Sequence, residues 1–99
     1  MAKQDKYTKA ARGQDCQVRL PGCQNNTETT VLAHYRMPGT CGMGAKPNNL
    51  QGAWCCLWCH DRIDGRAKID MPHDEIRLYH AEGVMRTTDQ LIATGVLKL

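Results

Sequence analysis

The residues best suited to chemistry lie in the run Cys56–His60, where two cysteines are separated by two residues and a histidine follows the second cysteine. A loop of this length brings both sulfurs close enough to bind one tetrahedral metal ion. The same five residues would also suit covalent attachment of haem. The other cysteines and His34, far upstream, decide between these two interpretations.

Four of the six cysteines fit a closed structural zinc site. The upstream pair flanks a turn at Pro21-Gly22, which can fold both thiols onto one ion although six residues separate them. The predicted thiolate ligands are Cys16, Cys23, Cys56 and Cys59. Cys41, in a loop rich in glycine and proline, could replace Cys23, whereas Cys55 is expected to fill core.

Disulfide bonds are the alternative use of so many cysteines. Residues 1–6 contain neither the apolar segment nor the cleavage site of a secretory signal, and no stretch is apolar enough to span a membrane. We therefore expect a cytoplasmic protein without a membrane partner, in which thiols stay reduced and bind metal. A c-type haem protein would need export, so the haem interpretation is disfavoured as well.

The composition describes a small, mildly basic domain. A chain of 99 residues with 5% aromatic side chains can bury only a modest core. A structural zinc ion adds on the order of 10 kcal/mol to folding, comparable with the whole stability of a small domain. The net charge of +3 is compatible with nucleic-acid binding but does not require it.

A histidine, an asparagine and a second histidine fused to a CxxC motif, with a further cysteine pair upstream, resemble the HNH endonucleases of the ββα-metal (His-Me finger) superfamily. More closely, the chain is similar to the YbcO-like nucleases of phages and prophages. The matching segments are residues 10–13, 16–22, 31–34, 41–42, 46–47 and 59–64. The resemblance extends from about residue 8 to about residue 66, and more loosely to the C-terminus.

This resemblance implies a metal-dependent endonuclease that hydrolyses DNA phosphodiester bonds in phage or prophage recombination or processing. His34 would be the general base, because an imidazole titrates near neutral pH. Asn49, or Asn48 in the alternative register, would keep His34 oriented. His60 and Asp61 would hold a catalytic Mg²⁺, Mn²⁺ or Zn²⁺ ion that stabilises the transition state. The implied DNA contacts are Lys9, Arg12, Arg36 and Lys46.

One position departs from the family pattern. HNH enzymes usually carry a metal ligand immediately before the first histidine, and this chain has Ala33 there. The cation would then need a ligand from elsewhere, with Asp61 and Asp64 as candidates. The alternative function is a non-catalytic zinc module that retains the nuclease fold and binds DNA or a phage recombination protein. A homodimer would suit the nuclease, since cutting both strands with one small site favours two copies.

Helices and strands must position these residues, and their sequence patterns indicate a single α+β domain over residues 1–99. Its core should lie at about 14–66, with a strand over 29–36 that carries His34 and a helix that starts after Cys56. By resemblance, this core is a small zinc-stabilised ββα-metal (HNH-like) domain with additional N- and C-terminal helices.

The additional helices flank the predicted core. The N-terminal helix, over about 3–12, ends at Gly13 and would carry a basic stripe on one face, formed by Lys3, Lys6, Lys9 and Arg12. The C-terminal helices are expected over about 71–94, divided at Gly83. Residues 96–99 could add an edge strand.

Overall fold

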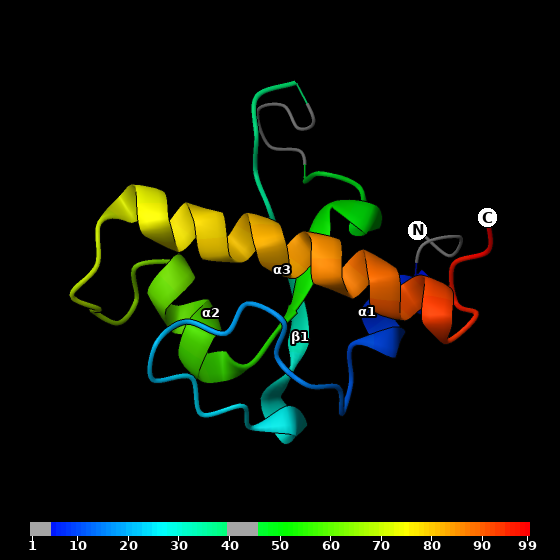
Figure 1. Ribbon diagram of the computed structural model, residues 1–99, viewed down its shortest axis with the longest axis horizontal. Helices are drawn as coiled ribbons and strands as arrows, with labels where there is room; N and C mark the ends of the chain where they lie inside the picture. Colours follow the sequence, from blue (N-terminus) through cyan, green and yellow to red (C-terminus); the bar gives the residue numbers. More distant parts are fainter. Residues whose placement is uncertain (1–4, 40–45) are drawn as a thin grey trace.

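A two-stranded antiparallel sheet and one long helix form the centre of the structure (Figure 1). The computed structural model describes residues 5–39 and 46–99. Strand β1 (Val31–His34) pairs with strand β2 (Gly52–Cys55), and helix α3 (His73–Ala93) lies across both strands. The described part of the chain is therefore an α+β fold, as the sequence predicts.

The register of the sheet fixes the position of His34. Val31 lies opposite Cys55, and His34 lies opposite Gly52. All four residues of β2 are buried, whereas β1 is exposed at Val31 and half-buried at His34. His34 therefore stands at the end of the sheet where residues 35–51 connect the two strands, with its side chain only partly covered.

Helix α3 runs without interruption through Gly83, where the sequence predicts a break. A side chain at this position would lie 3.1 Å from the backbone oxygen of Gln17 and 3.1 Å from Val18. Glycine therefore serves close packing here, because the helix must approach the neighbouring loop. One turn further on, the Thr87 hydroxyl accepts a hydrogen bond from the Trp54 amide at 2.9 Å and donates to the Gly83 carbonyl at 2.7 Å.

Two shorter α-helices and two 3₁₀ turns complete the described structure. Their bounds are α1 (Asp5–Ala10), η2 (Thr27–Thr29), η3 (Asn49–Gln51) and α2 (Leu57–Ile63). Helix α1 buries Tyr7 in a cluster with Trp54 of the sheet and Leu91 of α3, and Ala11, just after the helix, joins the same cluster. This packing fixes α1 beside the sheet. The helix ends at Ala10, before the end that the sequence predicts, and residues 3 and 4 of the predicted helix, with Lys3 of the basic stripe, lie outside the described residues.

The C-terminal tail folds back onto the same cluster. The Leu97 amide donates to the Leu91 carbonyl at 3.0 Å, and Val96 and Leu97 are half-buried against the cluster. The edge strand expected over 96–99 is therefore wrong, because the tail pairs with the end of α3 and not with the sheet. Among the described helices, none combines the length and apolarity that a membrane crossing requires.

Candidate functional site

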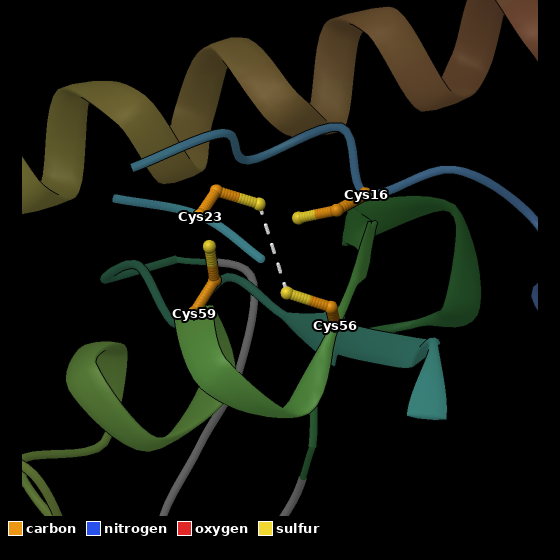
Figure 2. A group of neighbouring side chains, drawn as sticks. All are labelled: Cys16, Cys23, Cys56 and Cys59. Atoms are coloured by element: carbon orange, nitrogen blue, oxygen red, sulfur yellow. Dashed lines mark hydrogen bonds between the residues drawn. The ribbon is translucent and has the colours of Figure 1, made fainter. Parts of the chain in front are cut away.

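Four cysteines meet between the N-terminal loop and the start of helix α2 (Figure 2). The sulfur atoms of Cys16, Cys23, Cys56 and Cys59 all lie within 4.8 Å of one another, and those of Cys23 and Cys56 are 3.7 Å apart. Zinc–sulfur bonds of about 2.3 Å place the corners of a tetrahedron about 3.8 Å apart. The cluster can therefore hold a structural metal ion such as zinc, and it consists of the four residues that the sequence predicts.

The local backbone aims these thiols inward. Cys56 is the N-cap of α2 and Cys59 lies in its first turn, so the start of the helix supplies half of the cluster. In the loop that supplies the other half, Arg19 and Asn25 have positive φ angles of 57° and 47°. This left-handed backbone conformation costs about 1–3 kcal/mol for a residue other than glycine. It turns the amide of Arg19 toward the sulfur of Cys16, and the amide of Asn25 donates to Cys23.

The protons of the thiol cluster are unevenly shared. The pKa of Cys16 is lowered, first because the thiols of Cys55 and Cys59 donate hydrogen bonds to it and further by backbone amides. The pKa values of Cys55 and Cys59 are raised, chiefly because they donate to Cys16. Burial raises the pKa of Cys23 to about 11. Hydrogen bonding and burial in the cluster thus favour a thiolate at Cys16 over one at Cys23, Cys55 or Cys59.

Cys55 lies beside the cluster but is not one of its four corners. It is fully buried in the core, and its sulfur lies 3.5 Å from the Cys56 carbonyl oxygen. The expectation that Cys55 fills core is confirmed. Cys41, the predicted alternative to Cys23, lies outside the described residues.

A separate cavity of about 540 Å³ opens where β1 ends beside α2. Its wall combines two histidines and an asparagine with acidic, basic and hydroxyl side chains. The lining residues are Thr8, Leu32, His34, Arg36, Lys46, Asn49, His60 and Asp64. The structure therefore brings His34, Asn49 and His60 to one open surface, together with two of the four predicted DNA contacts.

His34 is held by a direct hydrogen bond to Asn49. The distance between His34 Nε2 and Asn49 Oδ1 is 2.8 Å, and the Asn49 side-chain nitrogen donates to Thr8 Oγ1 at 3.3 Å. Because the amide oxygen faces the ring, His34 must donate through Nε2. Its other ring nitrogen, Nδ1, then carries the lone pair of the neutral imidazole and can accept a proton.

His60 is paired with Asp64 one helical turn further along the chain. The distance from His60 Nε2 to Asp64 Oδ2 is 3.3 Å, and the Arg66 guanidinium lies 3.0 Å from the same carboxylate oxygen. Asp61, the predicted partner of His60, pairs with Arg66 at 3.0 Å and lines a different, smaller pocket with Trp58. The structure thus places Asp64, the other acidic candidate, in the cavity with His60.

A buried histidine supports the strand that carries His34. His80 of α3 donates from Nε2 to the Ala33 carbonyl at 2.9 Å and packs edge-on against Tyr35, with ring centroids 5.0 Å apart. Burial lowers the pKa of His80, so the ring is neutral and available as this donor at neutral pH. The residue before His34 is therefore anchored through its backbone, where its alanine side chain offers no ligand atom.

The chain matches, over residues 5–96, the sequence profile of a family described as "Putative nuclease YbcO". The chain belongs to this family. Curated relatives of the same description, from Escherichia coli (strain K12) and Enterobacteria phage 82, are each 47% identical over 93 residues, which is 91% of this chain and 94% of theirs. A solved structure of "a putative bacteriophage protein" from Escherichia coli K-12 is 39% identical, with a TM-score of 0.74, covering 90% of this chain and 99% of that one.

Within this YbcO-family chain, sequence reasoning missed two polar residues of the candidate site. Thr8 lines the cavity from α1, and His80 supports β1 from behind. Neither carries a motif, so no sequence signal could have found them. Lys9 and Arg12, predicted as DNA contacts, are exposed but do not line the cavity.

Proposed function

We propose that this chain is a metal-dependent endonuclease of the HNH (ββα-metal) type, which hydrolyses DNA phosphodiester bonds in phage or prophage recombination or processing. One observation carries the proposal: His34, with its Nδ1 lone pair, shares an open cavity with the His60–Asp64 pair. These are a general base and a nitrogen–oxygen ligand pair, which together suit hydrolysis of a phosphodiester.

Geometry supports His60 and Asp64 as ligands of a catalytic cation. Their donor atoms are 3.3 Å apart, and neighbouring ligands at about 2.1 Å from one ion lie about 3 Å apart. Arg66 shares the Asp64 oxygen, but its side chain is 55% exposed and can move away when a cation binds. Mg²⁺ or Mn²⁺ would suit such a site, because these ions keep several waters and bind phosphate oxygens directly. A bound ion there supplies charge stabilisation for the phosphorane and the leaving oxygen.

The residues of the chain divide the remaining work. His34 Nδ1 takes a proton from the attacking water, and the new phosphorus–oxygen bond displaces the 3′-oxygen, which is protonated by solvent. Asn49 holds the ring in the tautomer that this step needs. Arg36 and Lys46 offer positive charge at the cavity wall for the flanking phosphates. The cysteine cluster would hold a structural zinc ion that orders the loop and α2.

Nicking of supercoiled DNA in Mg²⁺ or Mn²⁺ tests the proposal. His34→Ala should lower the cleavage rate by about 10²–10⁴-fold, which is the usual contribution of a general base. His73→Ala is a matched control, since His73 is exposed at the first position of α3 and is not among the residues lining the cavity. Metal content and circular dichroism show that the variants are folded. Equal nicking by the wild type and His34→Ala would refute the catalytic assignment.

A non-catalytic zinc module is the second candidate. The alanine at position 33 favours this second function, because it removes a metal ligand from the position before His34. The proposed cation would then be held by the His60–Asp64 pair of the described cavity wall. Such a module would bind DNA with an affinity that falls steeply with salt, and it would not cut. The nicking assay separates the two functions, since only the endonuclease needs His34.

A further inference from the structure

Three side chains from distant parts of the sequence form a directed chain of hydrogen bonds at the cavity wall. His34 Nε2 donates to Asn49 Oδ1 at 2.8 Å, and Asn49 Nδ2 donates to Thr8 Oγ1 at 3.3 Å. Both donors point away from the His34 ring and toward Thr8. Hydrogen bonds aligned in one direction polarise and strengthen one another.

The chain ends at a hydroxyl that faces the cavity. Thr8 is exposed, lines the cavity from α1 and accepts the Asn49 hydrogen bond, so its own proton must point to another acceptor. Within residues 5–39 and 46–99, no hydrogen bond uses that proton. The neighbouring residues Arg36 and Lys46 make the same wall attractive to an anion.

We propose that the Thr8 hydroxyl binds a non-bridging oxygen of a DNA phosphate and thereby couples substrate binding to the His34 base. This inference rests on the proposed nuclease function. A phosphate oxygen that accepts the Thr8 proton places a negative charge at the end of the hydrogen-bond chain. That charge stabilises the imidazolium form, so His34 accepts the proton of the attacking water more readily when a phosphate is in place.

The position of Thr8 does not depend on this hydrogen bond. Helix α1 is fixed by Tyr7 and Ala11, which are 7% and 0% exposed in the core. The substitution Thr8→Val keeps the shape of the side chain and removes only the hydroxyl, so the helix should remain in place. Thr8→Ser keeps the hydroxyl and loses one methyl group.

Two measurements test the inference. In cleavage assays, Thr8→Val should lower kcat about 10-fold, the effect of losing one charge-assisted hydrogen bond, with a smaller change in KM, whereas Thr8→Ser stays near wild type. In NMR titrations, a short DNA duplex in EDTA should raise the pKa of His34 in the wild type and in Thr8→Ser, and less so in Thr8→Val. Thr94→Val is a matched control, because the Thr94 hydroxyl bonds only to the backbone of its own helix.

The inference and the proposed function fail in different ways. If the wild type cuts and Thr8→Val cuts equally fast, with the same duplex-induced change in the His34 pKa, the role of Thr8 is refuted and the nuclease stands. If the wild type does not cut, the function is refuted, and the NMR titration alone decides whether Thr8 links a bound phosphate to His34.

Discussion

Replacing Gly83 by alanine tests how tightly α3 is fitted to the loop that carries Cys16, the first cysteine of the thiol cluster. An alanine Cβ would lie 3.1 Å from the Gln17 carbonyl oxygen and from two carbons of Val18. Gln17 cannot easily move away, because its amide donates to the Trp54 carbonyl at 2.7 Å and its carbonyl accepts two hydrogen bonds from Arg86, at 2.9 and 2.7 Å. The close contact must therefore be relieved by strain in the helix or the loop.

Two opposing effects set the change in the free energy of unfolding. Alanine is favoured over glycine inside a helix by about 1 kcal/mol. Overpacking against a backbone that cannot move costs about 1–3 kcal/mol. We expect Gly83→Ala to lose about 1 kcal/mol of stability in all, which lowers the Tm of a domain of this size by about 4–8 °C.

Denaturant unfolding of the metal-loaded protein measures this change. Ala81→Gly, at a half-buried position of the same helix, should cost about 1 kcal/mol in helix propensity together with the loss of one methyl contact. Arg86→Met frees the Gln17 carbonyl, so the alanine at position 83 should be better tolerated in that background. If Gly83→Ala instead stabilises the protein by the full propensity gain, the close approach of α3 to Gln17 is refuted.

Three further predictions concern the thiol cluster, the buried histidine and the acidic residues of α2. Cys56→Ser should lose bound zinc and unfold, because the metal contributes on the order of 10 kcal/mol, while Cys55→Ala should keep its zinc; metal analysis with circular dichroism distinguishes them. Burial lowers the pKa of His80, so the neutral ring is favoured in the folded protein. Its contribution to the free energy of unfolding is fully present above the unfolded-state pKa of about 6.5 and is lost as pH falls below that value. His80→Gln should reduce this loss of unfolding free energy, measured in urea between about pH 8 and pH 5. Asp64→Asn should slow DNA nicking at limiting Mg²⁺, whereas Asp61→Asn should not; equal rates would contradict the assignment of Asp64.

Local patterns in the sequence were sufficient for the thiol cluster and for the strand that carries His34, whereas its partner strand β2 was not predicted. A CxxC motif and a Pro-Gly turn restrict the chain over a few residues, so four ligands could be named without knowing the fold. The strand that carries His34 and the helix after Cys56 followed from equally local signals. Local patterns were not sufficient at Gly83. A glycine inside a helix is interpreted as a break unless the neighbouring loop that requires close packing is known.

Choosing between Asp61 and Asp64 needed only the helical period. A residue four positions after His60 lies on the same helix face, whereas the next residue is rotated by about 100°. The observed 3.3 Å contact between His60 and Asp64 follows this rule. Thr8 was beyond such reasoning, since it meets Asn49 across 41 residues, and the pairing depends on how Tyr7 and Ala11 pack α1 against the sheet.

Adjacent residues of α2 connect the two candidate sites. Cys59 belongs to the thiol cluster, and His60 faces the cavity from the next position of the same helical turn. His34 lies at the other end of the sheet from the cluster, and it is held by Asn49 at its side chain and by His80 through the carbonyl of Ala33. A shift of the thiol-cluster end of α2 that is too small to unfold the domain would therefore displace His60 while leaving His34 in place. Such a displacement separates the base from the ligand pair even though neither histidine is altered, so the thiol cluster governs the proposed chemistry through geometry alone.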